Sequence, residues 1–317
     1  MIRAWVIAAL LLAHCAAWAQ TNASKNGSSA NGSSANGSLH GAFALLGDAP
    51  YSQPHANLLD GVIDEINAAK PAFVVHLGDI TGGSGPCTDE WFEARVRQFS
   101  RFTAPFVLVP GDNEWTDCHR TGYDPMERLA KIRQLFHSQP ISLTGFTRQS
   151  AEYPEHVRWT HGGAVFVGIN VPGSNNNLGR TPEMDNEHAV RMKAVLAWLD
   201  EAVKVSRSSK AQSLVVMMQA NPGFEGRRRA PGTIDGYADL REKLITIALK
   251  LGTPLVVAHG DTHRFKHDRP VVRAPNLVRI EVDGWPWLGW VKVSLTSELG
   301  LTSNSARPVV VERLLNH

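Results

Sequence analysis

Short apolar runs recur along the chain, and four of them stop at the dipeptide Gly-Asp. These runs are rich in Val, Leu, Phe and Ala and span only a few residues, a pattern that predicts strands of a parallel sheet covered on both faces. In such sheets ligands bind at the carboxyl ends of the strands. The four stretches are residues 43–48, 74–79, 106–112 and 255–261.

The segments between these runs carry apolar residues at helical spacing. After the first run, the spacing of an amphipathic helix with one buried face is found at Leu58, Leu59, Val62, Ile63 and Ile66. The order of elements predicts one α/β domain over residues 39–317, in which a sheet with outer helices packs against, or is extended by, an antiparallel second sheet. Further helices are predicted at 90–102, 126–136, 190–205 and 240–251, and further strands at 164–169, 214–218, 277–282, 290–295 and 308–314.

The N-terminus has the pattern of an export signal. Arg3 precedes an apolar run, and Ala17-Trp18-Ala19 suits a cleavage site, so residues 1–19 are predicted to be a signal peptide. A lipoprotein anchored at Cys15 is the alternative. Residues 20–38 form an Asn/Gly/Ser-rich repeat and are predicted to be a disordered tether. We therefore expect an exported protein, periplasmic or extracellular, whose mature chain has no transmembrane span.

Composition narrows the class of protein and of partner. The chain is 43% hydrophobic and 20% charged, as is typical of a globular domain, and its net charge of +2 gives no indication of nucleic-acid binding. Without the signal peptide, Cys87 and Cys118 are the only cysteines. An even pair in an exported chain predicts a disulfide, with two free thiols as the alternative.

The aspartates at the ends of the four apolar runs suggest a metal site. They are Asp48, Asp79, Asp112 and Asp261. Carboxylates that converge on one sheet edge repel one another unless a cation lies between them. The alternative is that each aspartate caps a turn or a helix without any metal.

The motifs, taken in order, resemble those of the calcineurin-like metallophosphoesterases. That family has the series D-x-H, G-D, G-N-H-D/E, a lone His and G-H-x-H. The resemblance implies an α/β fold of two sheets in a sandwich flanked by helices, with a two-metal site at the strand ends. The matching stretches are Gly47-Asp48-Ala49-Pro50-Tyr51, Gly78-Asp79, Gly111-Asp112-Asn113-Glu114, Met218-Gln219-Ala220-Asn221-Pro222 and Gly260-Asp261-Thr262-His263.

The chain departs from this series at several histidines. Pro50 stands where the first motif has its His, and Asn113 stands where the family has the His thought to assist catalysis. Oxygen donors replace most of the missing nitrogen ligands, which favours manganese or magnesium over zinc, with iron, zinc and calcium as further candidates. The metal ligands that the resemblance implies are Asp48, Asp79 and His263 by direct match, and Asp112, Gln219 and Asp261 by position.

Other residues are expected to support these ligands. Asn113 cannot supply a proton to a leaving group at neutral pH, so His119 is the candidate proton donor, with a surface histidine as the alternative. Glu114 is expected to orient its loop without binding metal. His259 is expected either to do the same or to replace a missing ligand, and His76 is expected to be a core residue.

These features predict an exported metal-dependent phosphoesterase that acts on a phosphorylated small molecule. In the family's scheme a metal-activated water attacks phosphorus while Asp79 bridges two divalent ions. The alternative, to which the missing histidines give weight, is a non-catalytic module that binds metal and a phosphorylated ligand on the same fold. The sequence leaves the oligomeric state open.

Overall fold

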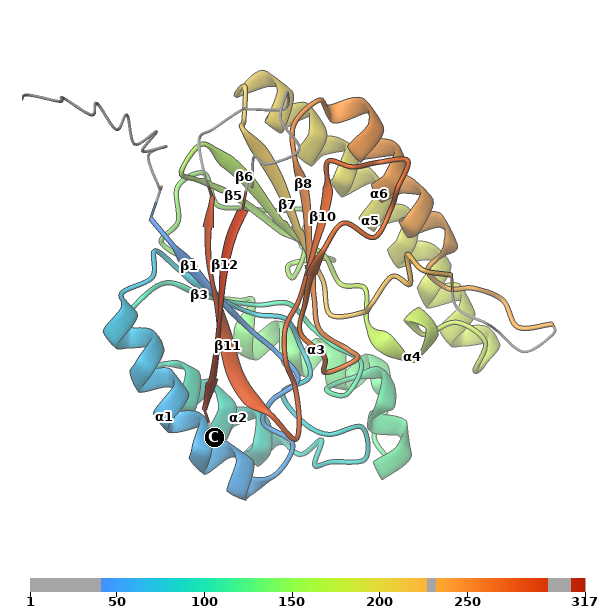
Figure 1. Ribbon diagram of the computed structural model, residues 1–317. Coiled ribbons are helices and arrows are strands. Elements are labelled where there is room, and N and C mark those ends of the chain that lie inside the picture. Colours follow the sequence, from blue (N-terminus) through green and yellow to red (C-terminus); the bar gives the residue numbers. More distant parts are fainter. Residues whose placement is uncertain (1–40, 227–231, 296–308, 317) are drawn as a thin grey trace, which may run out of the picture. The chain divides into compact units, whose positions relative to one another are not determined.

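Two β-sheets face each other across an apolar core, and helices cover their outer sides (Figure 1). The computed structural model describes residues 41–226, 232–295 and 309–316, which belong to one unit, Gly37–His317. The predicted signal peptide, the tether and Cys15 lie outside the described residues. The predicted α/β architecture of two sheets flanked by helices is confirmed.

The first sheet has the strand order β12-β11-β1-β2-β3 within the described residues. Its three parallel strands end at one edge and supply three of the Gly-Asp motifs, whereas β11 pairs antiparallel with both β1 and β12. The strands are β1 (Phe43–Leu46), β2 (Val74–His76), β3 (Phe106–Leu108), β11 (Leu288–Leu295) and β12 (Val309–Asn316).

The second sheet has the order β4-β5-β6-β7-β8-β10-β9 in the same part of the chain. Strands β6, β7, β8 and β10 are parallel, and the flanking strands are antiparallel. The strands are β4 (Thr147–Arg148), β5 (Val157–His161), β6 (Ala164–Gly168), β7 (Ser213–Met217), β8 (Leu255–His259), β9 (Lys266–Asp268) and β10 (Leu277–Glu281).

Local signals explain where most helices begin. The side chains of Ser52, Thr88, Asp124 and Thr181 each accept a hydrogen bond from a backbone N–H of the first turn that follows, as N-caps do. The longer helices are α1 (Gln53–Ala69), α2 (Asp89–Phe99), α3 (Pro125–Phe136), α5 (Pro182–Ser208) and α6 (Ala238–Leu251), and the short ones are η1 (Thr116–Thr121) and α4 (Gly173–Asn176).

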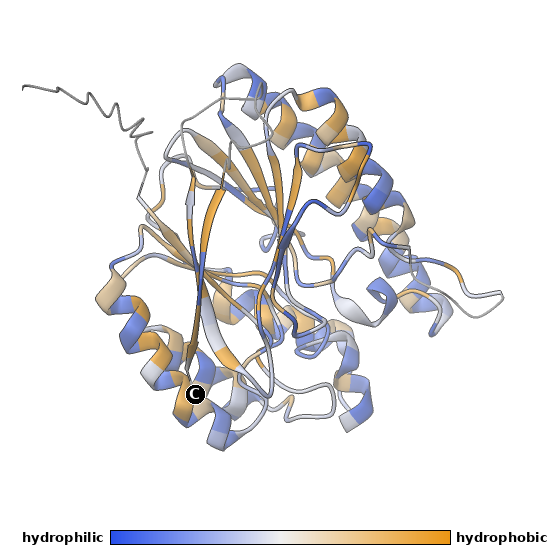
Figure 2. Ribbon diagram, viewed as in Figure 1, coloured by the Kyte–Doolittle hydropathy of each residue, from blue (hydrophilic) through white to orange (hydrophobic). Residues whose placement is uncertain are grey.

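The alternation of side chains along each strand divides the core into layers. In β1, Phe43 and Leu45 belong to the cluster between the sheets, while Ala44 and Leu46 pack on the side of α1 and α2. In β7 the same alternation sends Leu214 and Val216 toward α5 and α6. Because both faces of β1, β6 and β7 are covered, these central strands are almost entirely apolar and buried. Figure 2 shows hydrophobic strand segments between helices whose outer faces are hydrophilic.

The structure corrects parts of the predicted layout. Leu58, which was predicted on the buried face of the first helix, is 64% exposed. The last strands do not form a separate antiparallel sheet, since β10 is a parallel member of the second sheet and β11 and β12 extend the first. Helix α5 begins eight residues before the predicted start, because Thr181 caps it and Pro182 suits its first turn. None of the helices in the described part of the chain has the length and apolar character needed to cross a membrane.

Candidate functional site

Aspartates from both sheets lie together at the carboxyl ends of the parallel strands. Asp48, Asp79 and Asp112 follow β1, β2 and β3, and Asp261 follows β8. The backbone N–H of Asp261 donates to the carboxylate of Asp48, 3.1 Å from each oxygen. The two sheets therefore meet at their acidic ends.

Glycines beside the aspartates allow this close approach. A Cβ at Gly111 would collide with Oδ1 of Asp79, and a Cβ at Gly260 would collide with the carboxylate of Asp48. Each of these glycines thus makes room for the aspartate of a different motif. The repeated Gly-Asp pairs are explained by packing between motifs as well as by the turn that each pair makes.

The surroundings of the aspartates oppose their negative charge. Burial raises the pKa of Asp48 well above its usual value, and the charges of Asp261 and Asp112 raise it further. Burial, and next the charge of Asp112, raises the pKa of Asp79. Burial and the charge of Asp117 raise the pKa of Asp112 to about 8. Groups that perturb one another in this way attract protons or cations.

Asp79 is the most connected of the four carboxylates. Its Oδ1 accepts a hydrogen bond from the Asn113 backbone N–H at 3.1 Å. Its Oδ2 accepts hydrogen bonds from the Tyr51 hydroxyl and from Gln219 Nε2, both at 3.2 Å. The same hydroxyl lies 2.9 Å from Nε2 of His263, whose Nε2 is 3.7 Å from Oδ1 of Asp48. Five of the predicted site residues are thereby linked around one tyrosine.

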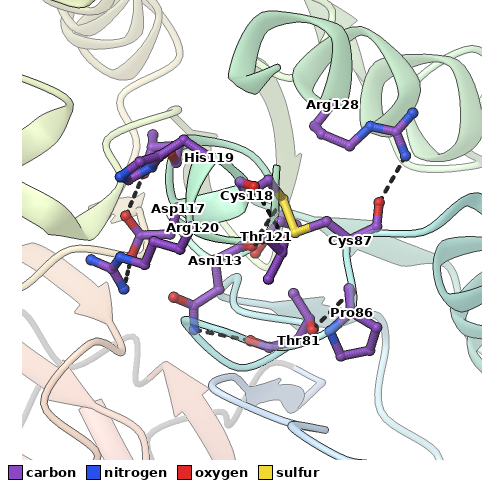
Figure 3. The surroundings of a disulfide bond; sticks show 12 residues. Thr81, Pro86, Cys87, Asn113, Asp117, Cys118, His119, Arg120, Thr121 and Arg128 are labelled. Carbon is purple, nitrogen blue, oxygen red and sulfur yellow. Dashed lines mark hydrogen bonds and ion pairs between the residues drawn. A yellow bond between two sulfur atoms is a disulfide. The ribbon is translucent and has the colours of Figure 1, made fainter. Parts of the chain in front are cut away.

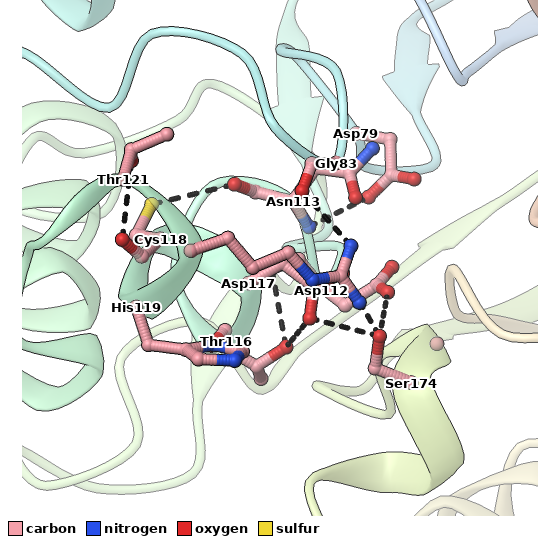
Figure 4. A network of polar contacts seen from close by, with 12 residues as sticks. Asp79, Gly83, Asp112, Asn113, Thr116, Asp117, Cys118, His119, Thr121 and Ser174 are labelled. Atoms are coloured by element: carbon pink, nitrogen blue, oxygen red, sulfur yellow. Dashed lines mark hydrogen bonds and ion pairs between the residues drawn. The ribbon is translucent and has the colours of Figure 1, made fainter.

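Asp112 joins a second chain of contacts that leads outward (Figure 4). The Ser174 hydroxyl lies 2.7 Å from Oδ2 of Asp112 and 2.9 Å from both carboxylate oxygens of Asp117. Asp117 forms an ion pair with Arg120 at 2.8 Å, and Arg180 donates to the backbone oxygen of Thr116 nearby. Two guanidinium groups therefore border the acidic cluster.

Glu114 is turned toward the backbone of the two loops that carry Asp79 and Asp112. Its carboxylate accepts hydrogen bonds from the N–H of Gly111 at 2.7 Å and from the N–H of Asp79 at 3.1 Å. Burial raises its pKa to about 7. Glu114 thus holds the backbone of the loops that carry Asp79 and Asp112 and thereby fixes the positions of these two candidate ligands.

A disulfide between Cys87 and Cys118 fastens the loop after Asp79 to η1, with the two Cα atoms 5.8 Å apart (Figure 3). Both sulfur atoms lie within 3.5 Å of the carbonyl oxygen of Asn113, whose side-chain amide donates to Thr81 O at 2.9 Å. The exposed side chain of His119 lies with Nδ1 2.8 Å from Thr116 O and 2.9 Å from Arg180.

Two of the histidines in the motif-bearing strands are buried away from the acidic cluster. Nε2 of His76 is 2.7 Å from Ala49 O, and its ring packs against Phe99 on the helix-facing side of the first sheet. His259 has Nδ1 2.8 Å from Gly260 O. By the alternation of β8 it shares the side of Val257, which faces α5 and α6. Burial lowers the pKa of both histidines to about 4.

Sequence reasoning missed several residues that contact the acidic cluster. Tyr51 stands three positions after Asp48, inside a recognised motif, so its place was a usable signal. Ser174 carries no such signal, because it lies in a short helix with left-handed backbone, φ 47° at Ser174 and 57° at Asn175. Arg120 and Arg180 are ordinary charged residues when the sequence is considered alone.

The donor chemistry of the site fits a hard divalent cation. Four buried or half-buried carboxylates and one imidazole meet there, and their charges raise one another's pKa. No three His, Cys, Asp or Glu side chains in the described residues are already arranged as a metal site. Tyr51 and Gln219 donate to Oδ2 of Asp79 and the Asn113 N–H donates to Oδ1, so both oxygens of this candidate ligand have hydrogen-bond donors as neighbours.

Comparisons with known proteins agree with this architecture. The chain is similar to a dimetal phosphatase from Danio rerio, with 13% sequence identity, a TM-score of 0.57, and coverage of 87% of this chain and 96% of that one. It is also similar to the purple acid phosphatase PPD1 from yellow lupin seeds, with 14% identity and a TM-score of 0.50 over 81% of this chain and 49% of that one. At such identities these likenesses concern the fold alone.

A search of curated proteins finds no match to this chain. The family model described as calcineurin-like phosphoesterase matches residues 42–265, which is more than half of the sequence and includes every one of the predicted site residues. The resemblance seen in the motifs is confirmed by this match, and the chain belongs to the calcineurin-like phosphoesterase family.

Proposed function

We propose that this protein is an exported, metal-dependent phosphoesterase that hydrolyses a phosphate ester of a small molecule. The observation that carries the proposal is the set of aspartates from both sheets whose buried charges raise one another's pKa. Bound cations would neutralise the repulsion among these aspartates, and in a phosphoesterase family cations serve to bind and polarise phosphate.

The residues that would hold the cations are those predicted from the motifs. Bound divalent cations would supply Lewis-acid chemistry, activating water and neutralising charge on the phosphate. Manganese or magnesium is favoured because the donors are mainly carboxylate oxygens. The proposed ligands are Asp48, Asp79, Asp112, Asp261 and His263, with Gln219 as a ligand through its amide oxygen.

The protein's own residues would position the ester around this set. The Asn113 backbone N–H already holds Oδ1 of Asp79. The side chains of Arg120 and Arg180 are 44% and 25% exposed, and their guanidinium groups can donate to phosphate oxygens. His119 remains the proposed proton donor, and its contact with Arg180 puts its imidazole beside one of these groups.

Export is proposed from the N-terminal pattern, and the buried disulfide supports it. Disulfides such as Cys87–Cys118 persist in oxidising compartments and are rare in the cytosol.

Asp79→Asn in the mature chain tests the proposal. Hydrolysis of an aryl phosphate and of an aryl phosphodiester would be measured with Mn²⁺, Mg²⁺, Zn²⁺ and Ca²⁺. We expect a loss of at least about 10³-fold, since metal-ion catalysis supplies several kcal/mol and each 1.4 kcal/mol is tenfold. Asp64→Asn, at an exposed position of α1, is the matched control and should keep the wild-type rate.

A second function, binding without turnover, is favoured by Asn113 and Gln219 at positions where the family has histidines. It predicts that cations raise the melting temperature of the wild type while no ester is hydrolysed. Cation-dependent turnover that disappears in Asp79→Asn would exclude it. Turnover that survives in Asp79→Asn would instead show that the proposed site is wrong.

A further inference from the structure

The turn at residues 284–287 presents two exposed tryptophans next to the acidic cluster. The side chains of Trp285 and Trp287 are 50% and 59% exposed. Large aromatic side chains are usually well buried, so exposed rings at the border of a site indicate contact with a ligand.

Trp285 is fixed directly to candidate ligands. Its backbone N–H donates to Asp48 O at 3.0 Å, and its carbonyl oxygen lies 2.6 Å from Nδ1 of His263. A Cβ at the neighbouring Gly284 would collide with both Asp48 and His263, so this glycine lets the turn approach. The position of the indole is therefore set by the same backbone that sets the site.

The Trp285 ring stacks on the ring of Tyr51, which contacts Asp79. The rings of Tyr51 and Trp285 are stacked with centroids 6.3 Å apart and planes 13° apart. The inner ring, Tyr51, has its hydroxyl on Asp79 and an edge contact with His263, at 5.4 Å between centroids. The outer ring, Trp285, is stacked on one side and half-exposed to solvent.

We propose that Trp285 is a stacking platform for a planar aromatic group of the phosphate ester, such as an aryl ring or a nucleobase. This inference rests on the proposed function and names its substrate class. A planar group in this position adds a third ring to a stack that the protein has already formed, whereas a flexible chain gains little from parallel geometry. Stacking on an exposed aromatic side chain also tolerates different rings, because each has a π-face.

The test measures binding, so that it does not depend on turnover. Phenylphosphonate and methylphosphonate, which carry the same anionic group and cannot be hydrolysed as esters, would be titrated calorimetrically into the mature chain with Mn²⁺ present. In the wild type we expect the phenyl compound to bind about tenfold more tightly. Trp285→Ala should remove most of this preference, and Trp285→Phe, which keeps a flat ring, should retain it.

Trp287→Ala is the matched control, because Trp287 lies in the same turn and is exposed to a similar degree; it should keep the preference. Equal losses in Trp285→Ala and Trp287→Ala, or no phenyl preference in the wild type, would overturn the platform. The platform would also be overturned if Trp285→Ala weakened the binding of a non-aromatic sugar phosphate by the same factor as that of phenylphosphonate. If Asp79→Asn keeps its turnover, the proposed function fails while this comparison of affinities still decides the role of Trp285.

Discussion

Asp79 and Glu155 are carboxylates buried to a similar degree, 4% and 0% exposed, but their environments act on them in opposite ways. Burial and neighbouring carboxylates raise the pKa of Asp79. Burial also opposes the charge of Glu155, yet His156 and the hydrogen bonds of Arg133 outweigh it and bring the pKa down to about 2. Because burial lowers the pKa of His156 to about 4, Arg133 carries this compensation at neutral pH.

The second region is a network in which each charge has a partner. We call Glu155, Arg133, His137, His156 and Asn170 the Glu155 network. Arg133 donates to both oxygens of Glu155, at 2.8 and 2.6 Å, and Asn170 Nδ2 donates to it at 3.1 Å. The comparison shows that burial alone does not make a carboxylate functional. An uncompensated charge indicates a ligand site, whereas a compensated one holds elements of the fold together.

The largest expected effect concerns stability and separates the two regions. Glu155→Gln should lower the free energy of unfolding by about 3–5 kcal/mol, because it leaves the Arg133 guanidinium without a counter-charge. Asp112→Asn, measured without divalent cations, should cost less than about 1 kcal/mol or stabilise, because it removes repulsion. Urea titration of both variants gives the two values.

The double variant Arg133→Met/Glu155→Leu is the control for this pair. Replacing both partners of a buried ion pair by apolar side chains is often nearly neutral, so the double variant should recover at least half of the loss. If Asp112→Asn is as costly as Glu155→Gln, the aspartate cluster is a structural network like the other, and the contrast fails.

Acid pH should affect the Glu155 network through its histidines. Burial lowers the pKa of His156 to about 4, below the usual value of about 6.5, so the folded protein resists protonation that the unfolded chain accepts. Its contribution to stability is complete above pH 6.5 and decreases as the pH falls toward 4. At pH 4.5 one such histidine costs about 2–3 kcal/mol by linkage.

His156→Asn, which keeps an amide N–H where Nδ1 contacts Gln149, should therefore reduce the acid slope of stability by about that amount between pH 6.5 and 4.5. His119→Asn, at an exposed position, is the control and should keep the wild-type slope. An unchanged slope in His156→Asn would mean that the imidazole takes up a proton within the folded protein.

The aspartate cluster could be predicted from the sequence, because each of its motifs is a short continuous stretch of the chain. The apolar runs ending in Gly-Asp identify β1, β2, β3 and β8, and parallel strands bring their carboxyl ends to one edge. The sequence alone therefore predicted that the aspartates lie together. It did not predict the partners that compensate the charge of Glu155, because these come from α3, a loop and the end of β6 and follow no periodic pattern.

Side-chain directions were also beyond the sequence. Tyr51 could be numbered within its motif, but its hydroxyl reaches Asp79 only because of the path that the chain takes after Asp48, with φ 50° at that residue. The link from Ser174 to Asp112 and Asp117 depends on left-handed backbone at a residue that is not glycine, which composition does not indicate. Strand β5 was missed because it has no continuous apolar run; its signal is the weaker alternation of buried Val157 and Trp159 with partly exposed residues.

The smallest expected effect links cations to pH at the aspartate cluster. The pKa of Asp112 is raised to about 8, so without cations its contribution is most favourable below the unfolded value of 3.8 and is lost as the pH rises toward 8. A cation takes the place of the proton, and its stabilisation should therefore grow from pH 5.5 to pH 8. With Mn²⁺ at ten times its Kd, the gain is about 1.4 kcal/mol, or roughly 3–5 °C in Tm for a chain of this size.

Thermal scans at both pH values test this, with Asp112→Asn expected to lose the pH dependence and Asp64→Asn expected to keep it. An equal shift at both pH values, or one that survives in Asp112→Asn, would mean that cations bind elsewhere and that the repulsion among these aspartates is relieved within the protein.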